Sequence, residues 1–175
     1  MKTYIKTYDN QITKKDCKFL IKTYDENQKE FGIRGRVYTK DEENALHPAK
    51  KCREIFLKGQ DNNKQLLKAE DITKEAITKC FQKYIADCPN ISDYIESHKK
   101  SIKTTQYQLR KYEVGDGFYW HVDSSRHHHL LACIVYLNKV KKGGETRFRF
   151  SSKNFGMEEH DVIPEPGKIL MFPAN

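Results

Sequence analysis

The tetrapeptide 120–123, Trp-His-Val-Asp, contains an imidazole and a carboxylate two positions apart. On an extended strand, residues i and i+2 project from the same face, so His121 and Asp123 can offer a ring nitrogen and a carboxylate oxygen to one ion. Two histidines and one carboxylate form the facial triad that holds non-haem Fe(II). The alternative is a surface strand pair, because His-x-Asp is common by chance. The spacing therefore indicates a candidate metal site that needs support from its surroundings.

The other histidines have weaker context. Residues 127–129 are three consecutive histidines, and consecutive side chains on a strand diverge, so we interpret this run as a polar loop. His160 lies in the acidic segment 158–161, which we interpret as a surface turn. His47 has no identifiable partner. None of these is predicted to be a metal ligand, and no catalytic residue is predicted beyond the ligands themselves.

The elements that must position the metal pair are short strands, most of them in residues 101–175. Continuous apolar stretches or alternating apolar and polar residues mark them, and turns rich in glycine separate them. The run 130–137 suits a strand buried on both faces. We expect strands over 3–8, 102–114, 118–123, 130–137, 146–150 and 168–172. This order predicts an antiparallel sandwich or barrel.

The first hundred residues are expected to be mostly helical. One helix starts after Thr13, with Asp16 placed for a capping interaction. A second has helical apolar spacing over 72–85, with Asp71 as its expected cap and Pro89 as its stop. We expect both helices to pack on the sheet and support it.

Length and composition limit the classes of protein to which the chain can belong. At 175 residues the chain suits one domain, predicted over 1–175, and the longest apolar run is too short to cross a bilayer. No apolar signal region follows Met1, so we expect an intracellular, cytoplasmic protein without membrane contact. Five cysteines form no CxxC pair, which favours reduced, buried thiols. The net charge of +8 is spread along the chain and is interpreted first as a solvated surface and second as a site for polyanions.

Four ordered blocks support the metal site. Residues 112–123 resemble the "Y-x-x-G-[DN]-x-[FY]-x-x-H-x-D" block of prolyl 4-hydroxylase-like Fe(II)/2-oxoglutarate-dependent oxygenases. Residues 134–138 resemble that family's "Y-L-N" strand, and 143–148 its "G-G-E-T-x-F" block. Residues 164–173 are similar to its "P-x-x-G-x-[LA]-[LI]-x-F-p" strand. Residues 30–100 carry no family signal.

The resemblance implies an α+β fold, with a double-stranded β-helix (jelly roll) core and supporting N-terminal helices. It implies that His121 and Asp123 bind Fe(II), that Tyr112 and Tyr136 contact 2-oxoglutarate, and that Thr146 faces its distal carboxylate. Ascorbate is a further candidate cofactor. The alternative for the two tyrosines is that they are sheet aromatics with a hydroxyl at the rim.

The family pattern continues beyond residue 173 with a second metal histidine and a basic residue for the cosubstrate, whereas this sequence ends at Asn175. Either the chain is part of a longer one, which the interrupted block favours, or it is complete and inactive. Two ligands alone are expected to bind Fe(II) weakly.

The resemblance implies a dioxygenase that hydroxylates a C–H bond, with a prolyl residue of a peptide or protein as the expected substrate. Two other functions stay open. The first is a nucleic-acid demethylase of the same superfamily, which the positive charge keeps in view. The second is a catalytically silent jelly-roll binding module, which would hold no metal. The oligomeric state is not predicted.

Overall fold

The computed structural model describes residues 4–36, 49–98, 106–123, 130–152 and 156–174. The histidine run and His47 lie outside these ranges. The helices are α1 (Lys14–Phe31), α2 (Lys64–Asp87) and α3 (Pro89–His98). The strands are β1 (Lys6–Tyr8), β2 (Ile33–Arg34), β3 (Lys50–Lys51), β4 (Arg53–Phe56), β5 (Gln108–Lys111), β6 (Gly117–Phe118), β7 (Leu131–Val135), β8 (Thr146–Ser152), β9 (Gly156–Val162) and β10 (Ile169–Pro173). Helices thus precede most of the strands, as predicted.

Helix α1 begins where its capping residue predicted. The Thr13 hydroxyl oxygen accepts a hydrogen bond from the backbone N–H of Asp16 at 3.1 Å, which satisfies one of the free amides of the first turn. The helix buries one face, made of Cys17, Leu20, Thr23, Tyr24 and Asn27. This face contacts α2 and β4. The first helix therefore supports the sheets, as expected.

Helix α2 begins earlier than predicted. Its cap is Asn63, whose side-chain oxygen accepts from the amides of Gln65 and Leu66 at 3.0 and 3.1 Å. Asp71 lies inside the helix, so its prediction as the cap was wrong. The helix ends at Asp87, just before Pro89 as predicted, but a third helix then begins at Pro89 itself. Proline fits the first turn of a helix because that position needs no amide donor.

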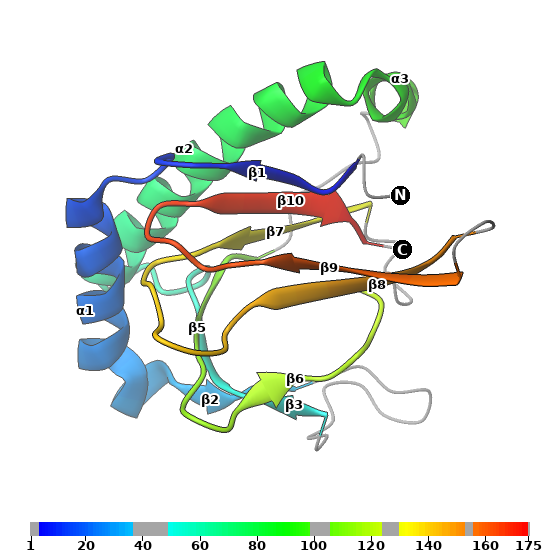
Figure 1. Ribbon diagram of the computed structural model, residues 1–175. Coiled ribbons are helices and arrows are strands. Elements are labelled where there is room, and N and C mark those ends of the chain that lie inside the picture. The colour runs from blue at the N-terminus through cyan, green and yellow to red at the C-terminus, as the bar shows by residue number, and fades with distance from the viewer. Residues whose placement is uncertain (1–3, 37–48, 99–105, 124–129, 153–155, 175) are drawn as a thin grey trace.

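The described strands form four small sheets in which every pairing is antiparallel. Their orders are β1-β10-β7, β2-β4-β5, β3-β6 and β8-β9. Strand β10 lies between β1 and β7 (Figure 1), with Met171 opposite both Lys6 and Cys133. The N-terminal strand thus pairs with the strand nearest the C-terminus.

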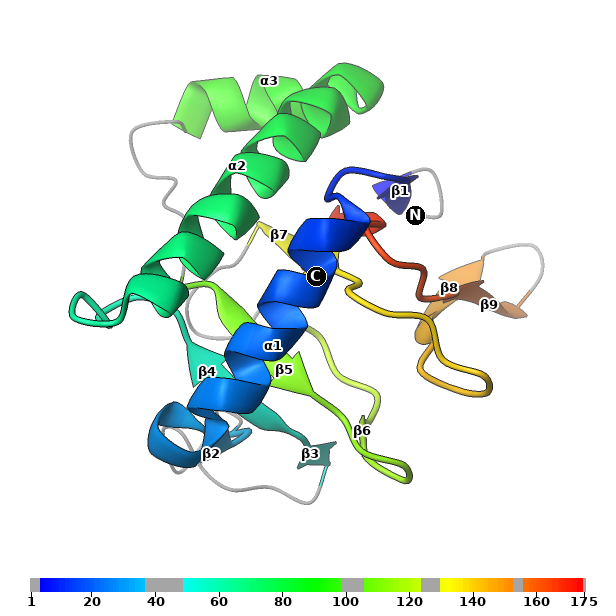
Figure 2. The ribbon, with the colours of Figure 1, turned by 90° about the vertical axis from the view of Figure 1, so that its left-hand side faces the viewer.

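The sheet β1-β10-β7 is covered on both faces. Ile169 and Met171 of β10 are buried in a core cluster with residues of α1 and α2. Leu170, between them, is buried on the other face with Tyr136 and Val162. Figure 2 shows the same arrangement, with α2 on one side of β7 and β10 and the β8–β9 hairpin on the other. Tyr136 is therefore positioned on the side of the sheet away from the helices.

Several strand predictions were only partly right. The five residues of β7 are half-buried rather than buried on both faces. Within the predicted strand 118–123, only Phe118 belongs to a strand. The acidic segment 158–161 is not a turn but part of β9, because it pairs along its length with β8. Strands β2, β3 and β4 were not predicted. Among the described helices, none is long and apolar enough to span a membrane.

Candidate metal centre

The side chains of His121 and Asp123 lie together, just after β6. His121 Nε2 is 3.2 Å from Asp123 Oδ1, and each side chain is about one-third exposed. Two ligands about 2.1 Å from one ion and at right angles to each other lie roughly 3 Å apart, so this pair fits two adjacent ligand positions. The donor pair is formed by an irregular segment rather than by the strand that the sequence predicted.

Two contacts orient the imidazole of His121. Its Nδ1 is 2.6 Å from the carbonyl oxygen of Tyr119, which directs Nε2 toward Asp123. Its ring stacks on Phe118, with centroids 3.5 Å apart and planes inclined by 16°. Burial lowers the pKa of His121, but hydrogen bonds to Asp123 and the Tyr119 carbonyl outweigh it, so the pKa is raised. A carbonyl partner on the second ring nitrogen is a common support for a metal-binding histidine.

Strand β3 holds this segment from behind. Lys50 pairs with Phe118 in the β3–β6 ladder, and the Tyr119 amide donates to the Ala49 carbonyl at 2.8 Å. Lys50 Nζ also lies 5.5 Å from the centroid of the Phe118 ring. The residues that position His121 thus come from a part of the chain without family motifs.

A buried carboxylate lies beside this support. Glu54 of β4 is 2% exposed, and its Oε2 is 2.9 Å from Lys50 Nζ and 3.3 Å from Arg110 Nε. Lys50 Nζ also donates to the Arg36 carbonyl at 3.0 Å. Charges at such depth are retained only when they are paired and hydrogen-bonded. The sequence offered no sign of this cluster, because charged residues on a short strand are ordinarily exposed.

Tyr112, the first predicted contact to 2-oxoglutarate, follows β5. Its side chain is 43% exposed, and its hydroxyl interacts with Cys52 and Arg110. Burial of the hydroxyl end raises the pKa of Tyr112 to about 12. Tyr112 therefore adjoins the Lys50–Glu54–Arg110 cluster. Lys50 of this cluster contacts Phe118, and the Phe118 ring stacks on His121.

Tyr136 and Thr146, the other two predicted contacts, touch each other. The Tyr136 hydroxyl donates to Thr146 Oγ1 at 2.6 Å. Tyr136 is 8% exposed, and burial raises its pKa to about 12. The structure thus brings the predicted residues into two groups, one around His121 and one between β7 and β8.

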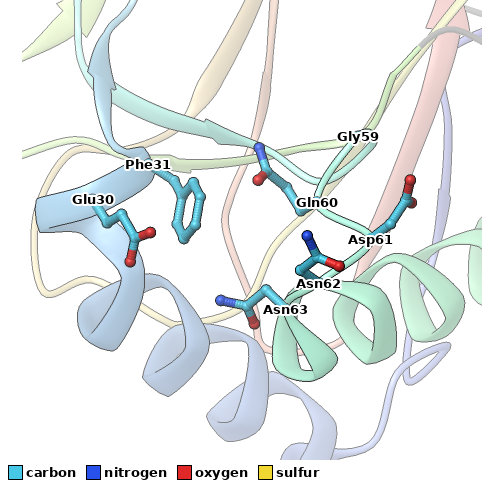
Figure 3. A pocket seen from close by; sticks show the side chains of 7 residues that line it. All are labelled: Glu30, Phe31, Gly59, Gln60, Asp61, Asn62 and Asn63. Carbon is cyan, nitrogen blue, oxygen red and sulfur yellow. The ribbon is translucent and has the colours of Figure 1, made fainter.

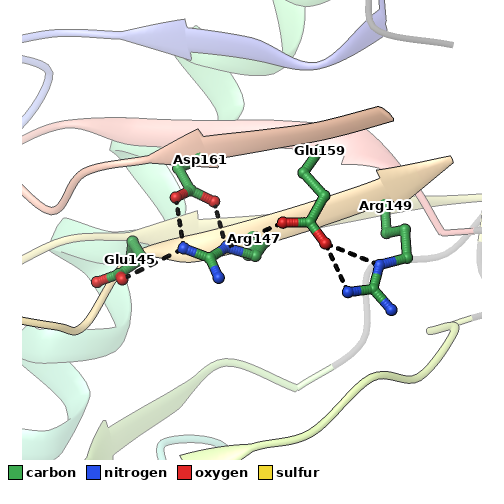
Figure 4. A network of polar contacts seen from close by, with 5 residues as sticks. All are labelled: Glu145, Arg147, Arg149, Glu159 and Asp161. Atoms are coloured by element: carbon green, nitrogen blue, oxygen red, sulfur yellow. Dashed lines mark hydrogen bonds and ion pairs between the residues drawn. The ribbon is translucent and has the colours of Figure 1, made fainter. Parts of the chain in front are cut away.

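A cation–π contact connects the segment of His121 with strand β8. The guanidinium of Arg149 lies 4.2 Å from the centroid of the Trp120 ring. Arg149 belongs to a surface network of two arginines and three carboxylates, drawn in Figure 4. Its best-defined pair is Arg147 with Asp161, where Nε and Nη2 donate to the two carboxylate oxygens at 2.7 and 2.8 Å. His160 of β9 packs near Phe148, with ring centroids 6.5 Å apart.

Among the described residues, no group of three or more His, Cys, Asp or Glu side chains could hold a metal ion. His160 is therefore not brought to His121 and Asp123. A hollow of about 430 Å³ between the end of α1 and the start of α2 contains none of the predicted site residues (Figure 3). Its lining is mainly polar: Glu30, Phe31, Gly59, Gln60, Asp61, Asn62 and Asn63. We locate the candidate site at the chemically matched pair instead.

Comparison with known proteins found one family match and one similar solved structure that bear on the site. Residues 107–175 match the family described as the 2OG-Fe(II) oxygenase superfamily. This segment contains the four motifs that the sequence analysis identified, and members of that superfamily use Fe(II) and 2-oxoglutarate. The structure is similar to a prolyl hydroxylase from Trichoplax adhaerens, solved in complex with a hypoxia inducible factor oxygen degradation domain peptide fragment. The TM-score is 0.67 at 14% identity, covering 98% of this chain and 73% of the other.

At that identity the likeness shows the fold alone. A search of curated proteins by sequence found no match. The mixed helix and strand architecture of a prolyl hydroxylase therefore extends over nearly the whole chain, although the family motifs occupy only its C-terminal part.

Proposed function

We propose that this chain is an Fe(II)- and 2-oxoglutarate-dependent dioxygenase that hydroxylates a prolyl residue of a peptide or protein. The observation that carries the proposal is the pair His121 and Asp123, with Nε2 and Oδ1 3.2 Å apart within the family segment. We further propose that the strands form the jelly-roll core of this family. The likeness to a prolyl hydroxylase fold supports both statements.

The residues have distinct roles in this proposal. His121 and Asp123 would hold the ion, and the Tyr119 carbonyl keeps the His121 tautomer with its proton on Nδ1, so that the lone pair of Nε2 is available to the metal. Tyr112, Tyr136 and Thr146 would contact 2-oxoglutarate. When bound, iron, 2-oxoglutarate and dioxygen supply the oxidising chemistry, and the protein supplies binding, orientation and exclusion of water.

The substrate assignment rests on the structural neighbour, which binds a peptide fragment. The comparisons give no support to a nucleic-acid substrate. A peptide or protein is therefore the partner that we propose, and proline is its proposed site of modification.

The first prediction tests the metal ligand. Asp123→Ala should lower iron-dependent succinate formation from 2-oxoglutarate by roughly 100-fold or more, because loss of a direct ligand should exceed the 10- to 100-fold cost typical of indirect supports. Asp71→Ala, which removes an exposed carboxylate of α2, should leave the rate unchanged. The measurement is succinate release with and without Fe(II).

An undiminished rate in Asp123→Ala would refute the assignment of that residue. Absence of bound metal from the purified protein, both with and without 2-oxoglutarate, would instead favour the silent binding module. Hydroxyproline detection by mass spectrometry in a proline-containing peptide tests the substrate separately.

A further inference from the structure

The buried cluster behind the candidate metal centre has an unequal balance of charge. Lys50 and Arg110 both contact the single carboxylate of Glu54. Among the described residues, no other carboxylate lies within ion-pair distance of either cation. Counted over the residues that the structure describes, two positive charges and one negative charge leave a net charge of +1, in a region where unbalanced charge is costly.

This charge lies on the face of the sheet that carries the candidate site. Along β4 and β5, Ile55 and Leu109 oppose each other and face the helical core. Their neighbours Glu54 and Arg110 also oppose each other, and successive side chains of a strand point to opposite faces. Arg110 consequently shares its face with Tyr112. Glu54 joins Arg110 to Lys50, which pairs with Phe118, the ring that stacks on His121.

Arg110 is the member of the cluster that reaches solvent. Its side chain is 39% exposed, whereas those of Lys50 and Glu54 are 5% and 3% exposed. Its Nε and Nη2 donate to Gln108 Oε1 at 2.8 and 2.6 Å. Gln108 is neutral, so it orients the guanidinium without cancelling its charge. An oriented, accessible guanidinium is well suited to carboxylates, which it can bind through two parallel hydrogen bonds.

We propose that Arg110, oriented by Glu54 and Gln108, binds a carboxylate group of a ligand that occupies the site beside His121 and Asp123. The involvement of those two residues rests on the proposed function. Carboxylate binding by Arg110 rests on the charge balance and can be tested alone. The carboxylate has two possible sources: a dicarboxylate cosubstrate, or an acidic side chain of a peptide substrate.

Arg147 provides the matched contrast. It also lies on a strand and is 44% exposed, but Asp161 engages it through both carboxylate oxygens, and Glu145 and Glu159 lie within ion-pair distance (Figure 4). Within this described network, three carboxylates oppose the two arginines Arg147 and Arg149. A further carboxylate gains little there, so Arg147 should not bind the ligand.

The experiment measures carboxylate binding to the metal-free protein by NMR. Succinate is titrated while the Nε–Hε resonance of Arg110 and the indole N–H of Trp120, the single tryptophan, are followed. We expect saturable shifts in the unaltered protein. Arg110→Gln should raise the Kd about tenfold or more, since a hydrogen bond to a charged group contributes roughly that factor. Arg147→Gln should leave the Kd unchanged.

Two further variants separate loss of binding from misfolding, which backbone amide NMR spectra of each variant would reveal. Arg110→Lys keeps the charge but loses the fork, and should bind with intermediate affinity. Lys50→Met leaves Arg110 in place but lowers the net charge of the cluster from +1 to zero, and should also weaken binding. Absence of saturable shifts in the unaltered protein, or equal Kd values for it and the folded Arg110 variants, overturns the proposal.

The same titration identifies the source of the carboxylate. 2-Oxoglutarate is compared with two proline-containing peptides that differ only in a glutamate or a glutamine beside the proline. If Arg110→Gln weakens the binding of 2-oxoglutarate, the carboxylate belongs to the cosubstrate. If it weakens the binding of the glutamate peptide alone, the carboxylate belongs to the substrate. Asp123→Ala should still bind succinate although it loses iron-dependent turnover. Loss of turnover therefore tests the proposed function, whereas loss of succinate binding tests the role of Arg110.

Discussion

At the scale of single residues, the orientation of His121 depends on its immediate neighbours rather than on a regular strand. The Tyr119 carbonyl lies 2.6 Å from Nδ1, and the Phe118 ring packs flat against the imidazole. Both contacts come from residues only two or three positions away, so the sequence near the motif suffices to form them. The pairing of Lys50 with Phe118 then fixes where this local unit lies in the molecule.

The buried hydroxyl of Tyr136 predicts a specific dependence of stability on pH. Its folded pKa is about 12, against 10.0 for an unperturbed tyrosine, so the fold favours the protonated form. This contribution is complete below pH 10 and is lost as the pH rises from 10 toward 12. The unfolding free energy should fall by about 1 kcal/mol from this group between pH 9 and pH 11.

Urea unfolding of the unaltered protein and of Tyr136→Phe at the two pH values measures that loss. The difference between the two proteins cancels the contributions of the other tyrosines. An identical fall in both proteins would contradict the assignment of the shift to Tyr136.

At the scale of elements, the second helix depends on a cap that the apolar pattern did not reveal. Asn63 accepts hydrogen bonds from the amides of Gln65 and Leu66, and its amide nitrogen also donates to Asn27 of α1 at 2.6 Å. One side chain thus both starts α2 and joins it to α1. The apolar spacing marked the interior of the helix more clearly than its start, because a cap is recognised by a single polar side chain.

Asn63→Ala should therefore destabilise the protein by about 1–2 kcal/mol, since it removes the cap and an interhelical hydrogen bond. Asn62→Ala, at the exposed neighbouring position, should change the stability by no more than about 0.5 kcal/mol. Thermal or urea denaturation of the two variants measures the contrast. Equal stabilities would show that the cap contributes nothing.

At the scale of the whole molecule, Gly167 connects distant parts of the chain. Its carbonyl accepts from the amides of Gln11 and Ile12 at 2.8 and 3.4 Å, and its amide donates to the Tyr136 carbonyl at 2.8 Å. Its φ is +83°, and an added Cβ would lie 2.3 Å from the Ile12 carbonyl oxygen. Only glycine permits both this backbone conformation and this approach.

Gly167→Ala should cost about 1 kcal/mol for the backbone conformation and about 1–3 kcal/mol more for the displaced N-terminal segment. Gly59→Ala is the control, because Gly59 has nearly the same φ of +84° but nothing within 4 Å of the added Cβ. Gly59→Ala should therefore lower the unfolding free energy only by the cost of the backbone conformation, about 1 kcal/mol. Similar urea midpoints for the two variants would show that the Ile12 contact is easily relieved.

The sequence by itself determined the features that depend on residues close together in the chain. These include the capped start of α1, the order of helices before strands, the glycine-rich connection before β8, where Gly143 and Gly144 have positive φ, and the motifs around His121. Helical and strand periodicity and turn chemistry are local properties, so a single sequence displays them.

Only the tertiary structure decided which charged residues are buried and which strands meet. Strand β9 was mistaken for a turn because its acidic residues are stabilised by the arginines of β8 rather than by any local pattern. Lys50 and Arg110 are 60 residues apart in the sequence, and nothing near either one predicts their shared contact with Glu54. The metal pair was readable because its two residues adjoin, whereas the charged cluster behind it exists only through long-range pairing of β3 with β6 and of β4 with β5.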